Sequence, residues 1–170
     1  MTPLTVRPID PARRADIGKL SALLQRSWGT TVVVSRSTAH DAAGLPGFLA
    51  ERGDEVVGGL TYRPAGAAWE VVTIDALPAG TGVGTALLDS VVSAATTAGA
   101  GRLWLVTTND NLDALRFYQR RGWRLTLVHP GAVDDARRIK PAILLVGSYG
   151  IEIHDELELS FDLRSSWRDA

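Results

Sequence analysis

Three glycines at alternate positions, Gly80, Gly82 and Gly84, form the pattern in this chain that most clearly points to chemistry. They follow an apolar run over residues 70–77 and precede a segment whose apolar residues, from Val83 to Ala95, recur at helical spacing. Glycine lets a backbone turn and approach a ligand without a Cβ clash. Amide N–H groups at the start of a helix attract phosphate. The pattern therefore predicts a strand, a phosphate-binding loop and a helix.

Two common phosphate-binding fingerprints fit this loop poorly. The dinucleotide motif G-x-G-x-x-G/A, counted from Gly80, would place its third glycine at Thr85, although Asp110 after the next expected strand resembles a ribose-binding acid. A P-loop ends in Gly-Lys-Ser/Thr, and residues 78–86 contain no lysine. The P-loop is thereby excluded, and the dinucleotide site stays as a minor alternative.

A second motif, N-x-x-A-x-x-F-Y-x-x-x-G-W, begins at Asn111. Together with G-T-G-V-G-T-A-L-L from Gly80, it is similar to the acyl-CoA pyrophosphate loop and the cofactor-closing signature of the GNAT superfamily of N-acyltransferases. The resemblance covers nearly the whole chain and is most specific over residues 69–129. One departure is that the family usually has Arg or Gln just before the glycines, where this chain has Pro78 and Ala79.

The resemblance implies one GNAT-like acyl-CoA-binding domain over residues 1–170. Its fold class is α+β: a mixed central sheet, with an antiparallel meander plus a parallel crossover, flanked by helices. The residues themselves favour the same arrangement. Expected strands over 48–51, 55–62 and 70–77 are joined by short turns, which is typical of a meander. The strand over 70–77, the helix after it and a strand over 102–108 predict a right-handed parallel crossover.

The sequence also predicts the secondary structure of residues 30–47 and of residues 151–161. We expect residues 30–35 to be extended and residues 36–47 to form a loop. Alternation over residues 151–161 predicts a final strand with Glu152, Glu156 and Glu158 on one face. Such an acidic row either attracts a cationic amine or is the solvated side of an edge strand, which is the more common case. Residues 165–170 are expected to be loose.

The resemblance also implies a site and a reaction. An amine would attack the thioester of acetyl-CoA, the co-substrate, directly. The sheet is expected to splay between residues 70–77 and 102–108, with the pantetheine arm paired to the backbone of Asp75, Ala76 and Leu77. The remaining expected cofactor-binding residues are those of the loop and the second motif: Gly80, Thr81, Gly82, Val83, Gly84, Thr85, Asn111 and Tyr118.

Two residues are candidates for moving protons. Tyr118 matches the family position of the acid that protonates the departing CoA sulfur, and its alternative is an ordinary core tyrosine. Glu70 is the candidate base for the amine, because related enzymes often carry glutamate there; its alternative is a solvent-facing strand carboxylate. Asn111 has two compatible roles, as the cap of its helix and as a contact to the cofactor.

Composition limits what else the chain can be. A length of 170 residues predicts one domain with a sizeable core. The absence of cysteine excludes disulfides, thiolate metal sites and cysteine nucleophiles, and His129 and His154 lack ligand spacing, so no metal is expected. A net charge of −1 gives no case for nucleic acid. With no apolar signal core and no membrane-length apolar run, we expect a cytoplasmic protein.

The leading hypothesis is an N-acetyltransferase acting on a primary amine of a small molecule or a protein. An alternative from another class is a non-catalytic acyl-CoA-binding regulatory module on the same fold. Dimers are common in the family, which adds a homodimer to the expectations. The sequence does not identify the acceptor amine.

Overall fold

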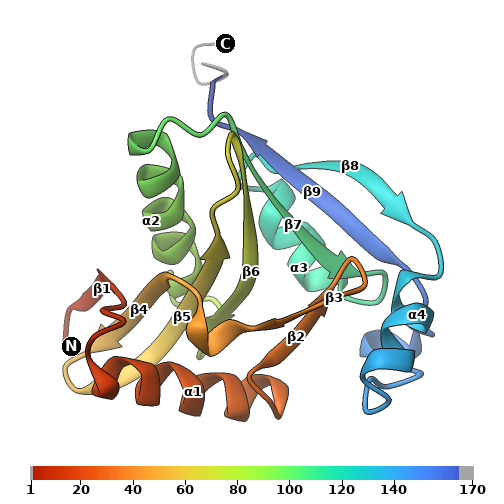
Figure 1. Ribbon diagram of the computed structural model, residues 1–170, viewed down its shortest axis with the longest axis horizontal. Helices are drawn as coiled ribbons and strands as arrows, with labels where there is room; N and C mark the ends of the chain where they lie inside the picture. The colour runs from red at the N-terminus through yellow and green to blue at the C-terminus, as the bar shows by residue number, and fades with distance from the viewer. Residues whose placement is uncertain (1, 165–170) are drawn as a thin grey trace.

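Seven strands form one mixed sheet in the order β1-β4-β5-β6-β7-β9-β8 (Figure 1). The computed structural model describes residues 2–164. The strands are β1 Leu4–Pro8, β4 Gly47–Arg52, β5 Glu55–Arg63, β6 Ala68–Ala76, β7 Arg102–Thr108, β8 Arg124–His129 and β9 Glu156–Asp162. Strands β6 and β7 run parallel, and the other neighbours in this sheet run antiparallel. The predicted meander (β4, β5, β6) and the parallel crossover that follows it are confirmed.

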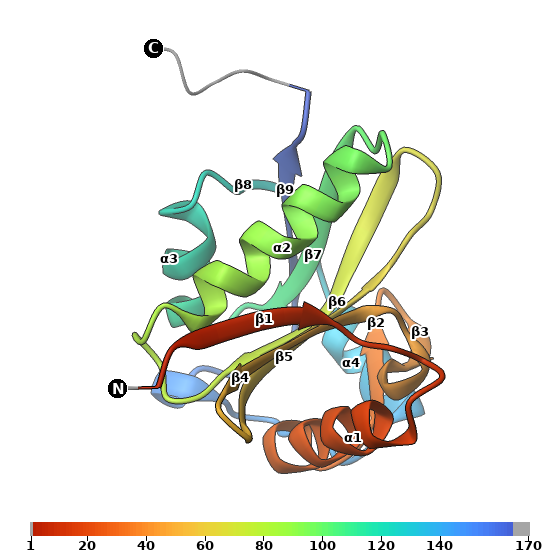
Figure 2. The same ribbon diagram turned by 90° about the vertical axis from the view of Figure 1, so that its left-hand side faces the viewer.

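Helices cover both faces of this sheet. They are α1 Arg14–Trp28, α2 Val83–Thr97, α3 Leu112–Gln119 and α4 Ala132–Ile139, with short 3-10 turns at Ala42–Gly44 and Ser148–Gly150. Figure 2 shows α1 and α2 on opposite sides of β1, β4 and β5. No helix within residues 2–164 combines the length and the apolar character that crossing a bilayer requires.

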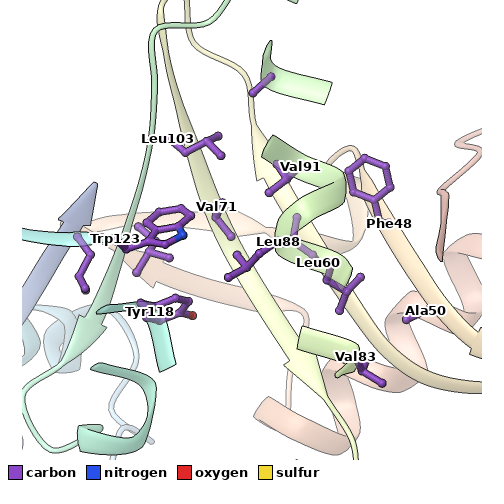
Figure 3. Packing of buried hydrophobic residues seen from close by; sticks show 14 of the residues in the cluster. Phe48, Ala50, Leu60, Val71, Val83, Leu88, Val91, Leu103, Tyr118 and Trp123 are labelled. Atoms are coloured by element: carbon purple, nitrogen blue, oxygen red, sulfur yellow. The ribbon is translucent and has the colours of Figure 1, made fainter. Parts of the chain in front are cut away.

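Helix α2 forms because its apolar residues make one continuous stripe. Leu87, Leu88, Val91 and Ala95 are at most 2% exposed and pack on the sheet in the main core (Figure 3). Full burial of such a side chain stabilises the fold by about 1.5–3 kcal/mol relative to exposure. The stripe therefore fixes the N-terminus of α2, and the loop before it, against the ends of β5 and β6.

A two-stranded hairpin lies where we expected a loop. Strand β2 (Val32–Ser35) pairs antiparallel with β3 (Thr38–Asp41), and the turn places Arg36 and Ser37 at φ 47° and 60°. The prediction of a loop is therefore wrong for residues 38–41. Non-glycine residues with positive φ are uncommon, so the sequence has no ordinary hairpin-turn signal at this point.

The last strand differs from the prediction in its start and its surroundings. It begins at Glu156 rather than at residue 151, and it lies between β7 and β8 instead of at an edge. Glu156 and Glu158 are 4% and 1% exposed, so the interpretation as a solvated edge face is wrong. Strand β8 covers the outer edge of β9, and the backbone N–H of Arg36 donates to Glu156. The prediction for residues 165–170 lies outside the described residues.

Candidate active site

A cleft opens where β6 and β7 part. The two strands pair only from Ala68 to Glu70 against residues 102–104, and beyond that point they separate. The cleft between them has a volume of about 290 Å³ and is lined by both strands, by Ser27 and Trp28 of α1, and by Asn111, Ala114 and Tyr118 of α3. The predicted splay of the sheet is therefore confirmed.

A β-bulge bends β6 beside this cleft. Thr61 of β5 pairs with Thr73, whereas the next residue, Tyr62, pairs with Val71, which leaves Val72 as the extra residue. Bulges bend a strand and re-aim the side chains that follow. Beyond the bulge the Asp75 carboxylate accepts a hydrogen bond from the Trp28 indole of α1 (2.8 Å), so it points to the α1 face of the sheet.

The glycine loop presents an unusual row of free donors. Among residues 2–164, none of the amide N–H groups from Gly80 to Thr85 has a hydrogen-bond acceptor, and the first bonded amide of α2 is that of Ala86, to Gly82 O (3.0 Å). Gly80 and Gly82 adopt φ 80° and 83°. Free amides beside a helix N-terminus form an anion-binding concavity. The loop therefore has the geometry of an anion-binding concavity, and its binding of a phosphate stays a prediction.

Gly84 is small for a different reason from its two neighbours. A Cβ at Gly84 would lie 2.9 Å from the Phe117 ring, whereas nothing lies within 4 Å of a Cβ at Gly80 or Gly82. Gly84 thus allows α2 to pack against α3. This contact places the cradle next to the helix that carries Tyr118.

Arg121 brings a positive charge to the same end of α2. Its guanidinium donates to Thr85 Oγ1 at 2.9 and 2.7 Å and lies 3.8 Å from the centre of the Phe117 ring. A hydroxyl oxygen that accepts two hydrogen bonds keeps only its own proton to donate, and that proton has no acceptor among the described residues. Sequence reasoning missed this pair, because only the fold brings residues 85 and 121 together.

Tyr118 is a core tyrosine that borders the cleft, and its role as the acid stays a prediction. The residue is 6% exposed, and its ring contacts Trp123 (Figure 3) and also Phe117, yet the residue lines the cleft. Its hydroxyl has no hydrogen-bond partner within residues 2–164. Burial, with a smaller contribution from the charge of Asp75, raises the pKa of Tyr118 above its usual value. The phenol therefore keeps its proton at neutral pH.

Asn111 caps α3 as predicted: its Oδ1 accepts a hydrogen bond from the Ala114 amide (3.2 Å). It also lines the cleft, and its contact with a cofactor stays a prediction. Of the three residues expected to pair with pantetheine, Leu77 lies just beyond β6 and already donates its N–H to Val57 O (2.8 Å). Because amides alternate in direction along a strand, the Ala76 N–H points away from β5, towards the side on which β7 lies.

Glu70 is buried and firmly held. It is 1% exposed, so the interpretation as a solvent-facing carboxylate is wrong. Its Oε2 pairs with Arg63 (2.8 Å) and its Oε1 accepts from the Ser35 hydroxyl (2.7 Å). It is absent from the residues that line the cleft. Its role as the base stays a prediction. Within residues 2–164, no three His, Cys, Asp or Glu side chains are grouped to hold a metal ion.

Comparison with known proteins identifies a family and a fold. The model of the acetyltransferase (GNAT) family matches residues 18–123. The Bacillus subtilis (strain 168) protein YdhI, described as uncharacterized, is 39% identical over 142 residues, which are 83% of this chain and 89% of that protein.

Solved structures show the same fold at low identity. An IAA acetyltransferase from Bacillus cereus ATCC 14579 aligns with a TM-score of 0.71 at 20% identity, over 94% of this chain and 99% of that one. A GNAT family acetyltransferase from Elizabethkingia anophelis, solved with acetyl-CoA bound, aligns with a TM-score of 0.67 at 20% identity, over 94% and 97%.

Proposed function

This chain belongs to the acetyltransferase (GNAT) family, and from that premise we propose that it is an N-acetyltransferase that transfers acetyl directly from acetyl-CoA to a primary amine. The acceptor amine belongs to a small molecule or a protein. The observation that carries the proposal is the row of unbonded amides from Gly80 to Thr85, in a structure whose parted strands form a cleft lined by Tyr118.

The donor side of the cleft suits acetyl-CoA. The free amides and the Thr85 hydroxyl are donors for a pyrophosphate, with the Arg121 guanidinium close behind them. The cleft between β6 and β7 offers about 290 Å³ to the pantetheine arm, and the Ala76 N–H points away from β5, towards the side on which β7 lies. Asn111 lies at the α3 side of the same opening.

The proposed chemistry needs an oxyanion donor and an acid. A free N–H at the end of β6 stabilises the negative charge that develops on the thioester oxygen. Tyr118 keeps its proton at neutral pH and donates it to the sulfur as the C–S bond breaks. The chain has no cysteine, so no acetyl-cysteine intermediate can form on it. This supports direct transfer.

The test is turnover with a panel of amines. The protein is incubated with acetyl-CoA and alkyl amines, arylamines or short peptides, and free thiol is followed over time. We expect thiol release above the hydrolysis rate with at least one amine. If acetyl-CoA raises the melting temperature but no amine accelerates thiol release, the non-catalytic acyl-CoA-binding module is the correct alternative.

We also propose that the protein forms a homodimer through the β8 edge of the sheet. Strand β8 pairs only with β9 among the described residues, and Leu125, Leu127 and Val128 on it are about half exposed. Exposed apolar edge strands favour association with another chain. Sedimentation velocity at several protein concentrations tests this, and a monomer at every concentration would contradict it.

A further inference from the structure

We propose that Asp75 is the general base that removes a proton from the attacking amine. This inference rests on the proposed transfer to an amine and adds the residue that prepares the acceptor. An alkyl ammonium has a pKa near ~10, so at neutral pH it must lose a proton before its nitrogen can attack.

A general base must border the cleft in which the amine would meet the thioester. Asp75 lines the cleft together with Tyr118, the proposed acid. Trp28 of α1 anchors its Oδ2 at 2.8 Å. Tyr118 belongs to α3, on the opposite face of the sheet, so base and acid approach the cleft from opposite sides. That is the arrangement needed when an amine enters from the α1 side and a thiol leaves on the other.

A general base must also lack a cationic partner that would hold it in its ionised form. Among residues 2–164, no Lys, Arg or His forms an ion pair with the Asp75 carboxylate, and its two hydrogen-bonding partners, Trp28 and Ser27, are neutral. Glu70 differs, because one of its oxygens pairs with the Arg63 guanidinium. Glu70 also lies where β6 and β7 still pair, whereas Asp75 lies five residues further along β6, where they have separated.

The electrostatic surroundings of Asp75 favour proton uptake. Partial burial raises the pKa of the Asp75 carboxyl, while the hydrogen bonds from Trp28 and Ser27 and the charge of Arg26 lower it, and the net direction is upward. The titratable groups that face it are Tyr118 from α3 and Arg26 from α1. Gly59, its partner on β5, contributes no side chain. A raised pKa brings a carboxylate closer to the working range of a base.

Each proton in the proposed reaction has a source and an acceptor. The ammonium gives one proton to Asp75, and the nitrogen lone pair then forms the C–N bond as the carbonyl pair moves onto oxygen. When the C–S bond breaks, the sulfur takes the proton of Tyr118, and Tyr118 regains a proton from the acylated nitrogen. Asp75 finally releases its proton to water. The net products are an amide, a thiol and one proton.

The first experiment compares Asp75→Asn with Glu70→Gln, and uses Asp89→Asn, an exposed carboxylate of α2, as a matched control. Asparagine keeps an oxygen to accept the Trp28 hydrogen bond. With an alkyl amine as acceptor, we expect Asp75→Asn to lower kcat by about 10²-fold with the KM for acetyl-CoA unchanged. The acidic limb of the kcat–pH profile should disappear in this variant and persist in Glu70→Gln.

The second experiment separates proton transfer from a structural role. An arylamine is already unprotonated at neutral pH, so the loss in Asp75→Asn should be much smaller with an arylamine acceptor. Trp28→Phe removes a hydrogen bond that favours the charged carboxylate, so it should move the acidic limb to higher pH. In the ligand-free protein, carboxyl NMR should show a group, absent from Asp75→Asn, that titrates above the ordinary aspartate value of about 3.9.

Failure of the proposed function and failure of the Asp75 assignment give different results. If no amine is acetylated by the wild type, the proposed function fails and the base role falls with it. If the wild type is active and Asp75→Asn keeps its rate and pH profile, or loses equally with both acceptor classes, only the assignment of Asp75 is overturned. Loss of the acidic limb in Glu70→Gln alone would make Glu70 the base.

Discussion

Tyr118 shows how one side chain can serve the core and the cleft together. Its ring packs between Phe117 and Trp123, while its hydroxyl is left without a partner in the described residues. A buried hydroxyl without a hydrogen bond is costly. Core packing holds the ring in one orientation, and the unpaired hydroxyl is then available to a ligand in the cleft.

Removing that hydroxyl should affect chemistry more than binding. In Tyr118→Phe the ring contacts persist, so we expect the fold and the affinity for acetyl-CoA to be nearly unchanged. The loss of a general acid should lower kcat by about 10²-fold. Steady-state kinetics and calorimetric titration with CoA check this. An unchanged kcat would remove Tyr118 from the proposed mechanism.

Arg121 should contribute to binding through Thr85. In Arg121→Gln, the hydroxyl of Thr85 loses two charge-assisted donors and the loop loses a nearby positive charge. Without those bonds the Thr85 hydroxyl is no longer held for a hydrogen bond to a charged phosphate, which contributes about 1.5–3 kcal/mol, so we expect CoA affinity to fall by about tenfold or more. Calorimetric titration measures this.

A double-mutant cycle with Thr85→Ala identifies the route of that effect. If Arg121 acts through Thr85, the two losses should not add, because the residues are in contact. Fully additive losses would mean that Arg121 acts independently of the hydroxyl. Arg120, its neighbour in sequence, is exposed and gives a charge-matched control as Arg120→Gln.

At the scale of the elements, the loop from Gly80 to Gly82 and helix α2 after it make different contributions to the proposed cradle. The helix supplies the stripe that fixes its position, and the loop supplies amides that point away from the protein's own acceptors. Positive φ at Gly82 is part of that geometry.

Gly82→Asp should abolish acetyl-CoA binding. Aspartate strains a backbone at φ 83° and adds a negative charge where a pyrophosphate is proposed to bind. Gly99→Asp is the matched control, because Gly99 has φ 76° just beyond the other end of α2 and also has nothing within 4 Å of a built Cβ. Both variants should lose stability, but only Gly82→Asp should lose binding in a thermal-shift titration with acetyl-CoA. Equal binding in the two would mean that the cradle is elsewhere.

The sequence predicts those elements whose signals are local. Strand β6, its loop and α2 are predictable because an apolar run, glycines and a helical stripe follow one another directly. The β2–β3 hairpin is missed because Arg36 and Ser37 adopt positive φ without glycine. The burial of Glu156 and Glu158 is missed because β8 pairs with the outer edge of β9, which no local pattern reveals.

In the candidate site, too, local motifs predict some residues and only the fold reveals others. The loop, Asn111 and Tyr118 could be identified from motifs, since their spacing along the chain is fixed. The side chains of Arg121 and Trp28 could not, because they reach Thr85 and Asp75 only through the fold. Glu70 was identified by position, but its contacts with Arg63 and Ser35 required the structure.

At the scale of the whole molecule, a partly buried ionic network holds α1 against the sheet. Arg7 of β1 pairs with Asp16 of α1 (2.7 Å) and with Glu51 of β4 (2.9 Å), and Lys19 of α1 also pairs with Glu51 (2.7 Å). Asp16 is 1% exposed. Helix α1 carries Trp28 at its far end, so the network also sets one wall of the cleft.

Asp16→Asn should destabilise the protein in a pH-dependent way. The hydrogen bonds from Arg7 hold the pKa of Asp16 well below its usual range. The stabilisation is therefore complete above the unfolded value of about 4 and is lost as the pH falls towards the folded pKa. We expect the melting temperature to drop by several degrees at pH 7, and the difference from wild type to shrink below about pH 4. A constant difference from pH 7 to pH 2 would contradict the ionic origin.

The early parting of β6 and β7 has a kinetic consequence. Residues of α1 and of α3, from opposite faces of the sheet, line one cleft, so we expect the amine and acetyl-CoA to occupy different ends of it. Under the proposed reaction, free CoA should inhibit competitively against acetyl-CoA and noncompetitively against the amine. Initial-rate product inhibition distinguishes this from a binding region shared by both reactants, in which a saturating amine would relieve inhibition by CoA.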